Sequence, residues 1–302
     1  MYGSSKDVGT IAAKMPALSE HGGRVNRVGF KRIELEGSLE KFGFFDEYTQ
    51  ESMDFDSDSE LMMHVNREML RGANEMTEDA LQIDLLNAAG VVRFANAAGS
   101  VAGIDENDLV TYDDLQKLSR DLDDNRMPKN TKIITGSRMI DTRTIDGARY
   151  IYIGSELVIT MRNMVDGFGN PAFIPVHQYG AATSLANGEI GSVGEFRIVV
   201  APEMMHWAGA GAASADESVY LTGAHVDVFP MLVVGSGAFT TIGFQTDGKS
   251  TKFKINHKKP GAAIADRNDP YGEIGFMSIK WYYGSMIQRP EWIACVKTAA
   301  VY

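Results

Sequence analysis

The sequence predicts an α+β fold in which a β-hairpin, a long helix and a shorter helix precede a sheet. Three observations predict this order. Apolar residues alternate in two runs before residue 50, they recur at helical spacing from about residue 58, and strand-like runs dominate after residue 132. The 302 residues, of which 44% are hydrophobic, suffice for one large domain or two smaller ones.

The N-terminal part of the chain divides into an irregular segment and a predicted hairpin. Residues 1–25 are punctuated by glycine and proline and keep no period, so we expect an arm that needs a partner to become ordered. Two apolar runs then flank a turn at residues 37–41, which predicts a β-hairpin. The apolar residues of these runs are Val28, Phe30, Ile33 and Leu35, followed by Phe42, Phe44, Phe45 and Tyr48.

A long helix is predicted from about residue 58 to residue 89. Ser57 and Glu60 have the spacing of a capping box, and Gly90 is placed as a C-terminal stop. Such a helix is roughly 48 Å long at about 1.5 Å per residue, far beyond the usual length. Its apolar or small stripe consists of Leu61, Val65, Met69, Ala73, Met76, Ala80, Ile83 and Asn87.

A second helix is predicted to begin at Thr111, with Asp114 completing its cap. Its inner face would carry Leu115, Leu118 and Leu122. Three aspartates, at 121, 123 and 124, lie at its C-terminal end, where the helix dipole disfavours them, and the sequence offers no reason beyond solubility. Strands are predicted at 132–134, 150–153, 196–200, 226–234, 239–244 and in the stretch 274–301, with a glycine-rich surface loop at 203–219.

The charge and cysteine content exclude several classes of protein. The net charge is −11, and we find no basic stripe of the kind that binds nucleic acid through its backbone. The densest basic run, Lys252 to Lys259, is interpreted as a solvated strand edge and turn. The single cysteine, Cys295, cannot form a disulfide within the chain and fits a reducing cytoplasm. Without an apparent signal segment or membrane-spanning run, synthesis in a cytoplasm is expected, without a role in a membrane.

One segment matches the phosphate-binding loop pattern letter for letter, Gly243-Phe-Gln-Thr-Asp-Gly248-Lys249-Ser250. In a nucleotide-binding protein a helix follows such a loop. Here the next residues alternate like a strand and Pro260 comes soon after, and Asp247-Gly248 is a natural hairpin turn. We therefore interpret the segment as a turn.

Other reactive residues also have structural interpretations. No histidines have metal-ligand spacing, and His206, beside Glu203 and Trp207, is interpreted as a loop or core residue. Cys295 is expected to be a buried packing residue. The acids at 54, 56, 58 and 60 lack the glycine that a calcium loop needs, since Leu61 stands there, and residues 266–270 form no complete cation loop. We predict no catalytic, cofactor-binding or metal-binding residues, no cofactor and no enzymatic activity.

Several segments together resemble the major capsid proteins of the phage N-four type. No one of them is highly specific, but their order and spacing cover most of residues 30–299. The segments are LEKFGFFDEY at 39–48, GVVRF at 90–94, NGEIGSVGEFRIVVAP at 187–202, GAAIADRNDPYG at 261–272, IKWYYGSMI at 279–287 and RPEWIA at 289–294. That family usually has more chain ahead of the hairpin region.

The resemblance implies the Hong Kong 97-type capsid fold. By that analogy residues 1–25 form an N-terminal arm, 26–55 an extended loop, 56–130 a peripheral domain with a spine helix, and 131–302 an axial domain with returning peripheral-domain strands. It also implies that the subunit self-assembles through pentamers and hexamers into an icosahedral virion shell around double-stranded DNA. Synthesis and assembly would take place in the host bacterial cytoplasm. Scaffolding, decoration or portal proteins would be further partners. The alternatives are an encapsulin-like nanocompartment, a phosphate-loop NTPase and a monomeric binding module.

Overall fold

The computed structural model describes residues 34–54, 61–129, 133–134, 143–144, 148–178, 187–241, 253–261, 265, 267 and 269–302. The chain divides into two units, Met1–Glu36 and Gly37–Tyr302. Of the first unit only residues 34–36 are described, without helix or strand. The expected N-terminal arm and the capping box at 57–60 lie outside the described residues. All the helices and strands that the structure describes belong to the second unit.

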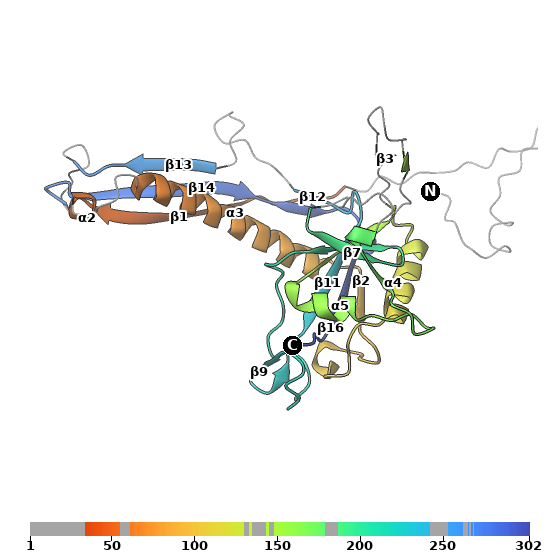
Figure 1. Cartoon of the computed structure of the whole chain (residues 1–302). Coiled ribbons are helices and arrows are strands. Elements are labelled where there is room, and N and C mark those ends of the chain that lie inside the picture. Colours follow the sequence, from red (N-terminus) through yellow and green to blue (C-terminus); the bar gives the residue numbers. More distant parts are fainter. Residues whose placement is uncertain are drawn as a thin grey trace, which may run out of the picture. The chain divides into compact units, whose positions relative to one another are not determined.

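A three-stranded antiparallel sheet is formed by β1 (Glu40–Thr49), β14 (Ile274–Tyr283) and β13 (Phe253–Lys258), with β14 in the middle (Figure 1). Phe42 of β1 and Phe253 of β13 both lie opposite Trp281. The sequence did not indicate this pairing of β1 with β14. Of the first strand of the predicted hairpin only residues 34 and 35 are described, and they lie in no strand.

Helix α3 (Leu61–Asn87) confirms the predicted long helix and extends over 27 residues, or about 40 Å. It follows the short helix α2 (Gln50–Asp54) and lies along the three-stranded sheet in Figure 1. Its first half packs Met69 and Ala73 against the inner face of that sheet, and its last turns pack Leu85 against a second, larger sheet. One helix therefore joins two hydrophobic cores.

Gly90 follows α3, but it is not the left-handed cap that the sequence suggested. Its φ is not positive. A Cβ at this position would lie 2.5 Å from the carbonyl oxygen of Pro290, and the Gly90 amide donates to that oxygen at 3.0 Å. A close approach of two backbones thus requires this glycine.

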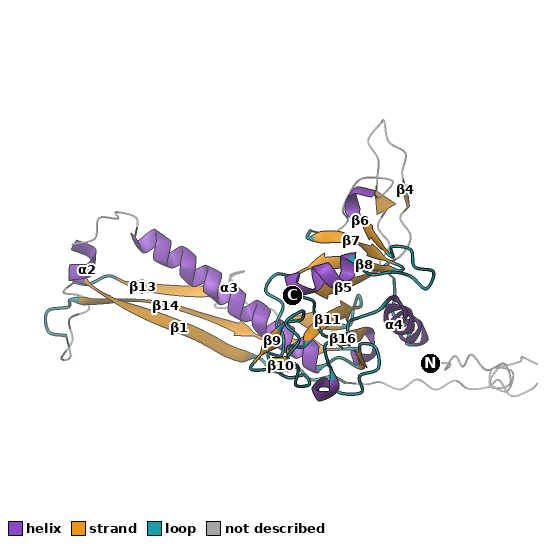
Figure 2. Ribbon diagram, turned by 60° about the horizontal axis from the view of Figure 1, so that its bottom comes forward, coloured by secondary structure: helices purple, strands orange, loops and turns teal. Residues whose placement is uncertain are grey.

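The larger sheet has seven strands in the order β2-β16-β11-β5-β8-β7-β6, of which β2–β16 and β5–β8 pair in parallel. Their bounds are β2 (Val91–Phe94), β16 (Ile293–Thr298), β11 (Phe229–Val234), β5 (Arg149–Ile153), β8 (Phe196–Val200), β7 (Glu189–Val193) and β6 (Phe173–Pro175). Helices α4 (Tyr112–Asp124) and α5 (Val158–Arg162) share one core with one face of this sheet, and the C-terminal turns of α3 pack on the other face (Figure 2).

Helix α4 begins as predicted. Thr111 and Asp114 form a complete capping box, and Leu115, Leu118 and Leu122 are buried. The structure also explains two acids at its C-terminal end. Asp121 pairs with Arg93 of β2, and Asp123 pairs at 2.6 Å with Arg149 of β5, which is only 1% exposed. These contacts connect the helix to the sheet and give the two acids partners of opposite charge.

The remaining elements are short. They are β3 (Ile133–Ile134), β4 (Arg143–Thr144), β9 (Leu221–Thr222), β10 (His225–Val226), β12 (Phe239–Thr241), β15 (Ser285–Ile287), and the 3-10 turns Val101–Gly103, Ser155–Leu157, Val176–Gln178 and Pro290–Trp292. The predicted strands therefore exist, with shifted ends. Among the described residues, no helix has the length and apolarity needed to span a membrane.

Candidate functional site

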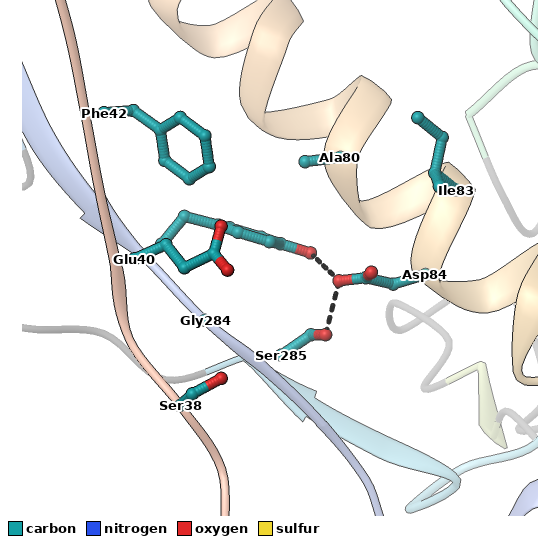
Figure 3. A pocket seen from close by; sticks show the side chains of 9 residues that line it. Ser38, Glu40, Phe42, Ala80, Ile83, Asp84, Gly284 and Ser285 are labelled. Atoms are coloured by element: carbon teal, nitrogen blue, oxygen red, sulfur yellow. Dashed lines mark hydrogen bonds between the residues drawn. The ribbon is translucent and has the colours of Figure 1, made fainter.

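A hollow of about 360 Å³ lies where α3 crosses the ends of β1 and β14 (Figure 3). Three segments far apart in the sequence build it: the start of β1, the last two turns of α3, and the passage from β14 to β15. Its described lining consists of Ser38, Glu40, Phe42, Ala80, Ile83, Asp84, Tyr283, Gly284 and Ser285. We call it the junction hollow.

Asp84 fastens α3 to the passage from β14 to β15. The hydroxyl groups of Tyr283 and Ser285 donate to the same carboxylate oxygen, Oδ2, at 2.8 and 2.5 Å (Figure 3). Burial, and then the hydrogen bond to Asp84, raise the pKa of Tyr283 to about 12. The phenol therefore remains a donor throughout the physiological range, and hydrogen bonds to a charged acceptor are among the stronger ones.

Gly284 makes the tight passage between the two strands possible. A Cβ at this position would lie 2.6 Å from the carbonyl oxygen of Ser38, so a larger residue would push β1 away from β14. The hollow is therefore a consequence of backbone geometry, with Phe42 and Ile83 as apolar walls and the carboxylates of Glu40 and Asp84 as its charges.

The chemistry of the junction hollow is that of recognition. Ser285 donates to a carboxylate, and the lining residues that the structure describes include no histidine or lysine that would act as its base. Two carboxylates beside the rings of Phe42 and Tyr283 are instead a setting that attracts a cation.

The face of the three-stranded sheet that points away from α3 is the second notable surface. We call it the outer sheet face, and its members alternate with the residues packed on α3. Phe45 is 65% exposed there, and the Nζ of Lys258 lies 5.7 Å from the ring centre of Phe276. Four lysines and one glutamate give the face a net positive charge. Its members include Lys41, Phe45, Glu47, Lys254, Lys258, Phe276 and Lys280.

The structure describes some of the reactive residues that the sequence singled out. The segment 243–250, with Lys249, lies outside the described residues, and the strand predicted after it is confirmed as β13. The ring of His206 stacks on Phe229 at 5.0 Å. Cys295 is fully buried in β16, as predicted, and burial raises the pKa of its thiol to about 12. No group of three or more potential metal ligands occurs among the described residues.

The sequence reasoning missed the junction hollow entirely. Asp84 and Tyr283 are 199 residues apart, so no local pattern joins them. One signal was present: Asp84 stands in the last turn of α3, where the helix dipole disfavours an acid. An acid in that position calls for a donor from elsewhere in the fold.

Comparison with known proteins identifies the family of this chain. A family model described as phage capsid protein matches residues 33–298. The chain belongs to the phage capsid protein family. The major capsid protein of Pseudomonas phage KPP21 is 64% identical over 302 residues, which cover 99% of this chain and 76% of that protein. The function is accordingly that of a phage major capsid protein, a structural subunit, which confirms the implied family.

Solved capsids share the fold at low sequence identity. The capsid of Ralstonia phage GP4 aligns with a TM-score of 0.60 at 12% identity, over 95% of this chain and 82% of that one. The Cyanophage Pam1 capsid aligns with a TM-score of 0.57 at 10% identity, over 95% and 83%. The Hong Kong 97-type capsid fold is thus confirmed. Of the alternatives, the family match favours a phage capsid over a nanocompartment, an NTPase and an unrelated binding module.

Proposed function

We propose that the subunit forms pentamers and hexamers that close into an icosahedral shell around phage double-stranded DNA. The observation that carries the proposal is the outer sheet face, where the 65% exposed Phe45 beside several lysines offers an apolar and charged surface for contacts between copies. Head-to-tail contacts between copies generate closed rings when the rotation closes.

The parts of the chain receive proposed roles within that shell. Residues 1–25 serve as an N-terminal arm, 26–55 as an extended loop, 56–130 as the peripheral domain, and 131–302 as the axial domain with returning peripheral strands. The pairing of β1 with β14, which also pairs with β13, supports the return of the late strands to the loop. Assembly takes place in the host bacterial cytoplasm, with scaffolding, decoration and portal proteins as partners, and the subunit has no enzymatic activity.

Particle size tests the proposal directly. Light scattering and negative-stain microscopy of the purified full chain should show closed shells, or rings that close into shells when concentrated. A monomer of 33.0 kDa at every concentration and salt, also in the presence of co-expressed phage head proteins, would contradict it. A nucleotide-turnover assay with Lys249→Ala as control checks the absence of enzymatic activity, since turnover abolished by that change would refute it.

A further inference from the structure

The junction hollow is negatively charged and large enough to hold the end of a side chain. It is about 360 Å³ in volume, a size at which proteins hold small groups, and its described lining contains two carboxylates and no basic residue. Both hydrogen bonds to Asp84 reach Oδ2, so its other oxygen remains for a further donor. In Figure 3 Glu40 stands on the opposite side of the hollow from Asp84 of α3.

Such a lining suits the end of a long basic side chain. The apolar walls, Phe42, Ala80 and Ile83, accommodate a methylene stem, and the carboxylates accept from the ammonium group. The ring of Tyr283 adds a face over which a cation is stabilised. An acidic group would be repelled by the two carboxylates, and a neutral one would gain no attraction between opposite charges.

The outer sheet face presents basic side chains of the kind required. One of them is Lys258, which is exposed at the end of β13 with its Nζ 5.7 Å from the ring centre of Phe276. Lys258 lies opposite Phe276, whereas the hollow is reached at Tyr283, seven residues along the same strand. At about 3.3 Å per residue this separation is roughly 23 Å, which no lysine side chain spans. Lys258 therefore cannot enter the hollow of its own copy.

We propose that Lys258 on the outer sheet face of one copy inserts into the junction hollow of a second copy. The inference rests on the proposed assembly and gives it a specific head-to-tail contact. The two surfaces are different patches of the same chain and have opposite charge, so the contact is heterologous and repeats around a ring. Complementary charge also fixes the register of neighbouring copies and disfavours wrong ones.

Exchange of the two charges tests the contact in the full chain. Lys258→Glu and Glu40→Lys, made separately, should each lower the yield of shells on the order of tenfold, because each creates a like-charge pair between copies. The double variant should restore the yield, because the pair is re-formed with its signs exchanged. Lys117→Glu on α4 is the matched control for a reversed exposed lysine, and it should assemble normally.

The outcomes separate this inference from the function on which it rests. If the unsubstituted chain forms no shells, the proposed function fails and the contact with it. If that chain and both single variants form shells in equal yield, only the contact is refuted. Shells of Lys258→Glu that form normally but retain no DNA would assign Lys258 to nucleic acid and also overturn it.

A cysteine pair tests the contact if a charge reversal fails to fold. The native Cys295 is buried, so new surface thiols react without competition from it. Shells of Glu40→Cys/Lys258→Cys, oxidised with oxidised glutathione, should give chains of disulfide-linked subunits on a non-reducing gel. Monomers only from such shells would refute the contact, and a Glu40→Cys/Lys117→Cys variant shows the background.

Discussion

The two sheets of this subunit bury their side chains in different ways. The seven-stranded sheet is packed on both faces, by α4 and α5 on one side and by the end of α3 on the other. In the part of the chain that the structure describes, the three-stranded sheet packs on α3 through one face only, and its other face carries the exposed Phe45 and four lysines. The stability of the subunit therefore depends mainly on the seven-stranded sheet, whereas the proposed contacts between copies use the three-stranded sheet. Substitutions in each sheet test this division of roles.

The largest effect is expected in the core of the seven-stranded sheet. Leu118 of α4 is 0% exposed, so Leu118→Ala should lower the free energy of unfolding by about 2–5 kcal/mol through lost burial and a cavity. Urea unfolding of the unassembled protein measures it. Leu70→Ala on α3 is the comparison variant: its side chain is 36% exposed, so the loss should be smaller, about 1 kcal/mol. Equal midpoints for the two variants would contradict the assigned core.

A smaller loss is expected at the joint between the two sheets. Gly284→Ala places a Cβ 2.6 Å from the carbonyl oxygen of Ser38, so β1 must shift, at a cost of about 1–3 kcal/mol. Gly99→Ala is its control, because nothing lies within 4 Å of the added atom. Thermal unfolding should show a lower Tm for Gly284→Ala alone. A Gly284→Ala protein as stable as Gly99→Ala would show that the passage is looser than described.

The hydrogen bonds at Asp84 predict that the same joint loses stability at alkaline pH. The pKa of Tyr283 is raised to about 12 in the fold, so the protonated phenol is favoured there. Its contribution to stability is complete below about pH 10, its ordinary pKa, and is lost as pH rises toward 12. Tyr283→Phe lacks this contribution, so the stability gap between the two proteins should narrow above pH 10. A gap that is constant up to pH 12 would contradict the shifted pKa.

The smallest effect on stability is expected at the outer sheet face. Phe45→Ser removes a mostly exposed ring, so unfolding of the unassembled protein should change by less than about 0.5 kcal/mol. Shell yield should nevertheless fall, because an exposed apolar side chain on an unpacked face serves contacts between copies. Light scattering and urea unfolding on the same preparations separate the two effects. A variant that loses stability and still assembles would reverse the division between the sheets.

How far the sequence predicted the molecule depends on the distance between interacting residues. Local periodicity predicted α3 and α4, and the spacing of Thr111 and Asp114 predicted a cap that the structure contains. The partner of β1 was missed, because Thr49 already lies 225 positions before Ile274 and no local signal specifies so distant a pairing.

The candidate sites divide in the same way. Cys295 was predicted as a packing residue from the apolar strand around it. The junction hollow was not found, since Glu40, Asp84 and Tyr283 come from three separate segments. Asp121 and Asp123 at the end of α4 and Asp84 at the end of α3 share one trait. Each lies where the helix dipole disfavours an acid, and each has a partner on a distant strand, as Asp123 has Arg149.

The strand order also constrains the timing of folding during synthesis. Strand β14 is the centre of one sheet, and β16 stands between β2 and β11 in the other. Both sheets thus need residues after 273, which leave the ribosome only after the first 273 have been made. A nascent chain cannot complete either sheet early, and its pairings span long stretches of sequence, which slows folding. Until then the early strands lack their partners, and their unpaired edges are open to contacts with other chains.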